Sequence, residues 1–310
     1  MQYKKIILTL KSWFITNFES DTVLSYIFWY NFESLQNIFD KFRNNENIPF
    51  LITNWFIENK FPRPFYFSSI KNEKKENFFD DIENEKIRKN LKKIDFLPIQ
   101  KNFFELLFND EIEKLNEKLK KYLETYKKEE NLINNIEYKN SIPRFNKKET
   151  NPYFLENVKY TNKNFVIYVK VFDENDFWLF FEKLKNTFEN IWFWKAKSRW
   201  YWHFKNVELK DLEKNEKEVF DYFDFLEKEK NLKIILNNFK PSKKDLENID
   251  LSNSFYQILS KNTKSLEEFN KNIFKWQMNF IKEGSVLKCK NKLIWDFYKS
   301  DNSYNFWYIF

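Results

Sequence analysis

The residues best suited to do chemistry in this sequence are gathered between positions 192 and 205, where the chain reads WFWKAKSRWYWHFK. Basic side chains form charge-assisted hydrogen bonds with phosphate, and tryptophan rings stack on unpaired bases. Taken literally, this combination of residue types resembles a groove for single-stranded nucleic acid. The alternative is a helix-to-strand corner whose aromatic side chains fill a core. The candidate contacts are Trp192, Trp194, Lys195, Lys197, Ser198, Arg199, Trp200, Trp202 and His203.

Nucleophilic and metal chemistry have little support elsewhere in the chain. His203 is the only histidine and Cys289 the only cysteine, so neither a paired-histidine metal site nor a disulfide framework can be built. No serine lies in the glycine elbow of a hydrolase. His203 has the chemistry of a general acid for metal-independent RNA cleavage, although a structural or ligand-contacting histidine is the commoner role. We therefore expect no metal and no cofactor.

The charge balance permits a polyanionic partner without identifying one. Lys and Arg number 53 against 46 Asp and Glu, a net charge of +7 that is spread along the chain. No segment reaches the roughly 18 apolar residues of a membrane helix, and the N-terminal apolar run is too short for a signal peptide. We expect a cytoplasmic protein without a membrane partner.

Two β-α-β patterns must position the 192–205 segment. The first has strands at 4–11 and 49–53, joined by a helix that begins at Ser20 or Asp21 as N-cap and runs to Phe42. The second has strands at 164–171 and 203–209, joined by a helix at 174–190 capped near Asn175 or Asp176. This order predicts an α+β fold with a ferredoxin-like core that is interrupted in the middle.

The interruption is a long charged insertion at about 66–160, preceded by the proline-fixed extended segment FPRPFYF. Within it, Ile112, Leu115, Leu119, Tyr122 and Tyr126 recur at three- and four-residue steps, which predicts a surface helix with one apolar stripe. We predict a first domain over 1–213 and a smaller, second ferredoxin-like domain over 214–310.

The composition contains one anomaly: the chain has one glycine, Gly284, and 11 tryptophans. Average glycine usage is about 7 per cent, because tight turns call for a residue without Cβ. Asparagine tolerates left-handed backbone and could replace glycine in some turns. The excess of Lys, Asn, Ile and Phe is typical of a gene under extreme AT pressure, but that pressure does not explain surplus tryptophan.

The spacing of the tryptophans points to a known motif. Replacing each tryptophan by glycine turns the segment into GFGKAKSRGYGHFK, which resembles the G-x-G-x-x-x-S-x-G-x-G loop of the RAMP superfamily of CRISPR-associated proteins. Further blocks resemble the subunit named Csm four of the type III-A effector complex. They are LKSWFITNFESDTVLSYIFW, IPFLITNWFIENKFPRPF, KNSIPRFNKKETNPYFLE, IKEGSVLK and YNFWYIF. In the third block, Lys139 stands where the family pattern has histidine.

The resemblance suggests that tryptophan occupies positions where the family has glycine. We hypothesise that the gene reads UGA as glycine and was translated with UGA as tryptophan, most firmly at Trp192, Trp194, Trp200 and Trp202, and less so at Trp13 and Trp29. Glycines would let consecutive backbone N–H groups turn towards phosphate, whereas tryptophan rings would block the approach of the RNA backbone.

The resemblance implies a non-catalytic RNA-binding subunit that holds the repeat-derived 5′ handle of the crRNA. Its expected protein partners are the large Cas ten subunit and the first repeated backbone subunit. Matching by motif adds four supporting RNA contacts, at Ser12, Arg63, Asn140 and Arg144. The insertion is expected to carry subunit contacts or a thumb-like element.

Two alternatives remain open at this point. A Cas six-like processing endoribonuclease would use His203 as general acid, although that family carries its glycine loop close to the C-terminus. A generic single-strand-binding protein would use real tryptophan platforms and bind with little sequence preference.

Overall fold

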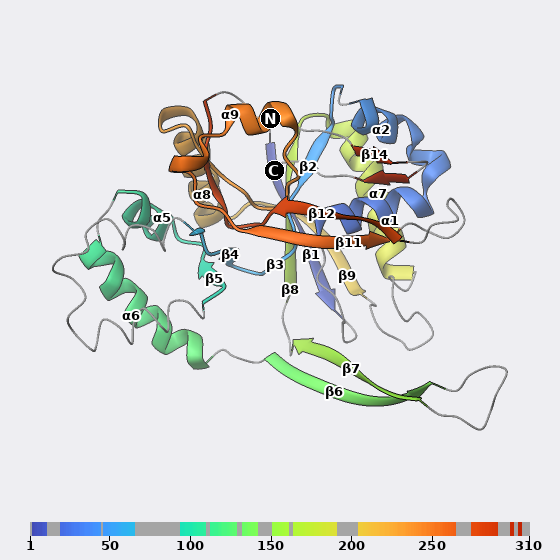
Figure 1. Cartoon of the computed structure of the whole chain (residues 1–310), viewed down its shortest axis with the longest axis horizontal. Helices are drawn as coiled ribbons and strands as arrows, with labels where there is room; N and C mark the ends of the chain where they lie inside the picture. The colour runs from blue at the N-terminus through green and yellow to red at the C-terminus, as the bar shows by residue number, and fades with distance from the viewer. Residues whose placement is uncertain are drawn as a thin grey trace.

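The structure of the chain is a computed structural model. It describes residues 2–10, 19–44, 46–65, 94–109, 112–128, 132–141, 151–160, 164–190, 204–264, 274–290, 298–300 and 303–305. Helices lie on both sides of one central sheet, and a long β-hairpin extends away from this body (Figure 1).

Strands from both predicted β-α-β patterns form the central antiparallel sheet. They are β1 (Gln2–Leu10), β2 (Phe50–Ile52), β8 (Asn164–Val171) and β9 (Phe204–Asp211), in the order β2-β8-β1-β9. The short β3 (Phe56–Ile57) also pairs with β8. The first and third strands in chain order lie at the centre, as in a ferredoxin-like βαββαβ unit. The predicted core is confirmed.

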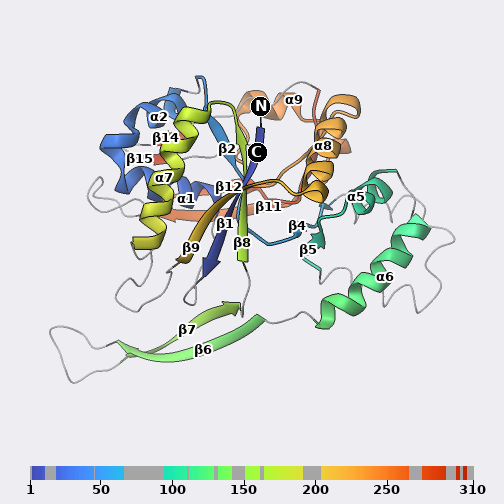
Figure 2. The same ribbon diagram turned by 180° about the vertical axis from the view of Figure 1, so that it is seen from behind.

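Alternation of side chains along β1 directs its two faces to different helices. Tyr3 stacks on Phe220 of α8 (Lys214–Glu229), with ring centroids 4.8 Å apart. On the other face, the Lys4 ammonium lies over the Trp178 ring of α7 (Glu174–Asn190). The helices α1 (Ser20–Tyr30) and α2 (Phe32–Asn44) share the α7 side, as both views show (Figure 1 and Figure 2). The sheet is thus covered on both faces.

The first predicted helix is broken at Asn31, which separates α1 from α2. The Asn31 side chain donates to the Ile27 carbonyl at 3.0 Å and to Thr187 Oγ1 of α7 at 3.0 Å. It therefore closes the end of α1 while tying that end to α7. The periodicity of the sequence continues through the break, so the single-helix prediction was wrong here because a long-range contact decides the geometry.

Both predicted helix caps are displaced. α1 begins at Ser20, and the Ser20 N–H donates at 2.9 Å to Oδ1 of Asn54, a residue just after β2. At α7, the carboxylate of Asp173 accepts from the Asp176 N–H at 3.1 Å, so the cap lies ahead of the predicted Asn175 or Asp176. Asparagine and aspartate are both good N-cap residues. In α7 the capping aspartate directly precedes the helix, whereas the asparagine that caps α1 comes from a distant part of the chain.

The insertion contributes to the body as well as extending from it. β4 (Lys60–Pro62) pairs with β5 (Phe96–Pro98), and α5 (Lys101–Phe108) packs its buried Phe104 against Phe223 of α8, with centroids 5.0 Å apart. The predicted amphipathic helix is α6 (Ile112–Lys128), and its Leu115 and Leu119 are buried as expected. β6 (Leu132–Ser141) and β7 (Asn151–Tyr160) form the hairpin that lies outside the body in both views (Figure 2).

The C-terminal part is built mainly from paired strands. They are β10 (Leu232–Ile234) with β13 (Val286–Lys288), β11 (Ile258–Lys264) with β12 (Phe274–Ile281), and β14 (Tyr298–Ser300) with β15 (Ser303–Asn305). α9 (Lys243–Asn248) and the 3-10 turn η3 (Leu251–Asn253) lie between β10 and β11 in the chain. The α+β class is confirmed. Apolar residues of α8, β10 and β13 join the same hydrophobic core as the sheet, and the domain boundary at 213 stays a prediction.

Among the described residues, no helix combines the length and the apolar character that crossing a bilayer requires.

Candidate nucleic-acid interface

One end of the central sheet gathers the segments that carry the predicted RNA contacts. Leu10, the last residue of β1, is paired with Phe204, the first residue of β9, and Thr9 is paired with Asn164, the first residue of β8. The chain segments 11–18, 191–203 and 161–163 therefore join the sheet at this same end. Segment 11–18 contains Ser12, segment 191–203 contains the tryptophans, and segment 161–163 links the hairpin to β8.

The anchors of the 191–203 segment are held firmly. Phe204 stacks on Phe188 of the last turns of α7, with ring centroids 4.9 Å apart. Next to this contact, the carboxylate of Glu189 in α7 accepts a hydrogen bond from the Val207 N–H of β9 at 3.0 Å. Both chain ends of the segment are thus fixed to each other by an aromatic contact and a charge-assisted hydrogen bond. A ligand bound by this segment would therefore have a defined position with respect to the sheet.

Polar side chains line the described part of this end. Thr9 Oγ1 donates to Asn164 Oδ1 at 2.9 Å, and Asn164 Nδ2 donates to Glu58 Oε2 at 3.0 Å. Lys205, the second residue of β9, is exposed. Its ammonium is the described cation closest in sequence to the predicted loop, and it is available to a phosphate group.

Most of the predicted contact residues lie outside the described residues. They are Trp192, Trp194, Lys195, Lys197, Ser198, Arg199, Trp200, Trp202, His203, Ser12 and Arg144. Asn140 lies on β6, paired with Pro152 near the far end of the hairpin. Arg63 lies in the body, directly after β4. The predicted contacts for the sheet end and for the hairpin therefore stay predictions.

Arg63 occupies a partly buried position between two prolines. Its N–H donates to the Asp95 carbonyl at 2.9 Å, and its carbonyl oxygen faces the backbone of Gly284. Burial lowers the pKa of the Arg63 guanidinium, and the Asp95 carboxylate partly opposes this effect. The guanidinium remains a cation. Because folding has already removed part of its hydration, binding an anion requires less further desolvation free energy. Such a cation is suited to an anionic ligand.

A buried polar junction connects four chain segments, and its centre is Asn54. Its Oδ1 accepts from the N–H of Ser20, its N–H donates to the Leu236 carbonyl at 3.1 Å, and its Nδ2 lies 3.4 Å from Glu283 Oε2. Asn54 is only 4% exposed, and its neighbour Thr53 is fully buried. Sequence reasoning missed Asn54, although it directly follows the PFLIT strand. Its partners are too distant in sequence to be inferred.

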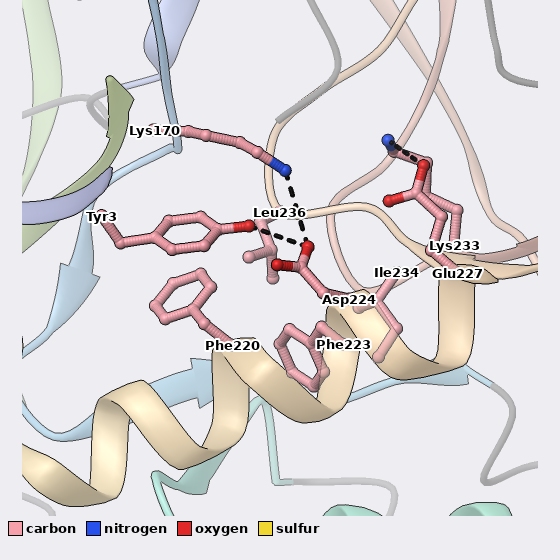
Figure 3. A pocket seen from close by; sticks show the side chains of 9 residues that line it. All are labelled: Tyr3, Lys170, Phe220, Phe223, Asp224, Glu227, Lys233, Ile234 and Leu236. Atoms are coloured by element: carbon pink, nitrogen blue, oxygen red, sulfur yellow. Dashed lines mark hydrogen bonds and ion pairs between the residues drawn. The ribbon is translucent and has the colours of Figure 1, made fainter. Parts of the chain in front are cut away.

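A small described cavity lies at the opposite end of the sheet and does not fit a nucleotide. Tyr3 Oη donates to Asp224 Oδ1 at 2.9 Å, Lys170 Nζ lies 3.5 Å from the same oxygen, and Lys233 pairs with Glu227 at 3.1 Å (Figure 3). The cavity measures about 30 Å³, enough for one water molecule. Burial raises the pKa of the Tyr3 phenol, which stays a neutral donor. The polar side chains that line the cavity therefore pair with one another.

Metal ligands do not gather in the described part of the chain, where no group of three His, Cys, Asp or Glu side chains could hold an ion.

Comparisons with known proteins show similarity at the level of structure. No protein-family model matches the chain, and no curated protein matches its sequence. A chain from the crystal structure of the Csm3–Csm4 subcomplex of the type III-A CRISPR–Cas interference complex is 18% identical. That alignment covers 99% of this chain and 98% of the other, with a TM-score of 0.63. Chains from two Csm1–Csm4 cassette structures, with cA4 and with AMPPNP, are each 13% identical with TM-scores of 0.55, covering 99% of this chain and 96% of theirs. The protein therefore has the fold of chains found in type III-A CRISPR complexes.

Proposed function

We propose that this chain is a subunit of a type III-A CRISPR effector complex, in the position of Csm four. The observation that carries the proposal is the structural alignment, which spans nearly the whole of this chain and of its neighbours. The neighbours come from a Csm3–Csm4 and a Csm1–Csm4 assembly, and Csm4 is the component that both assemblies contain. A single domain shared by chance would not align from end to end.

The positions of the family-like sequence blocks support the same assignment. The three blocks that contain Ser20, Asn54 and Glu283 are widely separated in sequence but meet at the Asn54 junction. The proline-flanked Arg63 belongs to the same block as Asn54, and its carbonyl oxygen lies against Gly284, which follows Glu283 in the block IKEGSVLK. Blocks that resemble one family and assemble into one junction are mutually consistent.

The proposed role is to hold the 5′ handle of the crRNA at the Leu10–Phe204 end of the sheet. In this proposal the 192–202 segment is a glycine loop whose backbone N–H groups face phosphate, and Lys195, Lys197, Ser198 and Arg199 add side-chain donors. The large Cas ten subunit and the first backbone subunit are the proposed protein partners. The β6–β7 hairpin, which extends from the body (Figure 1), is the described element best placed to reach a neighbouring subunit.

The proposed role is non-catalytic, and His203 is the residue that tests this point. Repeat RNA is incubated with the complex and with a His203→Ala variant. Intact RNA in both samples supports a binding subunit. Cleavage that depends on His203 would instead support the endoribonuclease alternative.

The central experiment is reconstitution of the complex from the genes that neighbour this one. The chain is expressed with the large and backbone subunits and a crRNA, both as written and with glycine at 192, 194, 200 and 202. We expect the glycine form to retain crRNA and to protect its 5′ handle from nuclease. Retention only by the tryptophan form, with equal affinity for unrelated RNA, would support the generic single-strand binder. Codons read as UGG at the four positions would reject the recoding hypothesis.

A further inference from the structure

Gly284 has an unusual place among the turns of this chain. In the described part, four residues have left-handed backbone: Asn47, Asn59, Asn231 and Gly284, with φ of 48°, 64°, 55° and 86°. Asparagine thus serves three of the four positions, as its tolerance of positive φ allows. Positive φ alone does not explain why the fourth position keeps glycine.

The distinguishing feature of Gly284 is the close approach of another backbone. A Cβ at Gly284 would lie 2.6 Å from the carbonyl oxygen of Arg63, a distance that side-chain Cβ atoms do not tolerate. The contacting atom belongs to the backbone of a segment between two prolines, so it cannot turn aside as a side-chain tip can. Glycine is required here by contact with Arg63 as well as by φ.

Hydrogen bonds on both sides of the contact fix its geometry. The Phe65 N–H donates to the Gly284 carbonyl at 2.7 Å, while the Gly284 N–H donates to the Ile235 carbonyl at 2.7 Å. The Arg63 N–H in turn donates to the Asp95 carbonyl. The segment around Arg63 is thereby held by Asp95, just before β5, and by the turn at Gly284, so the partly buried guanidinium is attached to a backbone with little freedom.

We propose that Gly284 is a positioning residue for RNA binding, because its bare backbone seats the Pro62–Arg63–Pro64 segment so that Arg63 meets a phosphate of the bound crRNA. This inference rests on the proposed function and adds a role to a residue distant from the predicted loop. An arginine that is already ordered and partly desolvated loses less on binding than a mobile surface arginine. Displacement of its backbone by a methyl group would remove that advantage.

The test compares variants in the reconstituted complex with crRNA as the probe. Arg63→Ala and Gly284→Ala are each expected to weaken crRNA binding about tenfold or more, as for loss of a hydrogen bond to a charged group. The double variant is expected to be no weaker than either single one, because both remove the same contact. Gly284→Asn satisfies the positive φ but keeps the Cβ, so it should behave like Gly284→Ala. Ser285→Ala is the matched control, since the Ser285 side chain donates to the Lys282 carbonyl within the same turn.

A second pair of variants keeps the test decisive if Gly284→Ala does not fold. Phe65→Pro removes the N–H that donates to Gly284, whereas Phe65→Ala retains it, and both remove the ring. We expect weaker crRNA binding in Phe65→Pro than in Phe65→Ala. Additive effects of Arg63→Ala and Gly284→Ala, wild-type binding by Gly284→Asn, or equal binding by the Phe65 pair would overturn the inference. Absence of crRNA from the wild-type complex would instead reject the proposed function itself.

Discussion

The ammonium of Lys5 lies 2.8 Å from Oε2 of Glu216, between the central sheet and α8, and both side chains are almost fully buried. Lys5 also contacts Glu213 Oε1 at 2.8 Å, while Tyr168 Oη donates to Glu216 Oε1 at 2.9 Å. Glu213 and Glu216 form the capping box at the start of α8. One charged cluster therefore fixes where α8 begins and which face of β1 it covers.

Removing one member of this pair should destabilise the protein strongly. Lys5→Met leaves the Glu216 carboxylate buried without its cation, and loss of one partner of a buried pair costs about 3–5 kcal/mol. Adding Glu216→Gln should recover part of the loss, because the amide still accepts a hydrogen bond without carrying charge. Urea unfolding followed by circular dichroism measures both values. Equal stability of Lys5→Met and the parent protein would contradict this view of the cluster.

The same cluster predicts a loss of stability at alkaline pH. Burial alone lowers the pKa of Lys5, but its bonds to Glu213 and Glu216 outweigh burial, and the pKa lies above its ordinary value of 10.5. Burial, with the Glu216 charge, raises the pKa of Tyr168 well above 10.0. Both groups hold protons in the folded state that the unfolded chain releases first. The unfolding free energy should therefore fall as pH rises above about 10.

The matched control for this pH effect is Lys5→Met/Tyr168→Phe. It lacks both titrating groups but keeps Tyr3 and the other ionisable residues. Unfolding free energies measured from pH 8 to pH 11 should decline more steeply in the parent protein than in this variant. Parallel curves would show that the cluster does not cause the alkaline loss.

Local patterns predicted the four main strands of the central sheet and α7 because those elements follow their own periodicity. β8 spans Asn164–Val171 as expected, and its buried apolar run needs no distant partner to be recognised. The break at Asn31 follows from a bond to Thr187 of another helix, which no local pattern reveals. The same limit applies to the Asn54 junction, whose contact with Glu283 spans 229 positions. Sequence blocks indicated that these segments matter, and only the fold shows that they meet.

The exposed Lys205 should contribute to RNA affinity by placing its charge next to a phosphate at this end of the sheet. In the reconstituted complex, Lys205→Ala is expected to weaken crRNA binding modestly and to reduce the slope of log affinity against log salt by about 1. Lys228→Ala is the control, because Lys228 is an exposed cation in the last turn of α8, towards the Tyr3 end of the sheet. Binding titrations at several salt concentrations measure the slope. An equal change in both variants would show that Lys205 acts only through net charge.

The hairpin should be dispensable for folding but required for assembly. In the described part of the chain, β6 and β7 pair with each other and with no other strand. Replacing residues 132–160 by a short glycine-serine linker is therefore expected to leave the thermal midpoint nearly unchanged. Size-exclusion chromatography of the reconstituted complex should then show weaker association with the backbone subunits. A large drop in the thermal midpoint would show that the hairpin belongs to the core, and normal assembly would reject its proposed contact role.

The tryptophans should divide into two classes when each is replaced by glycine. Trp55 is 9% exposed and stacks on Phe165 with ring centroids 3.9 Å apart, so its packing alone accounts for an aromatic side chain. Trp55→Gly should destabilise the protein by about 3–5 kcal/mol, as for other large-to-small core changes. Trp192→Gly with Trp194→Gly should cost little stability and should increase crRNA retention, if glycine is the natural residue of the loop. Thermal unfolding and crRNA retention, measured on the same samples, separate the two classes. A loop variant that lost as much stability as Trp55→Gly would show that the loop tryptophans belong to the folded core and would end the recoding hypothesis there.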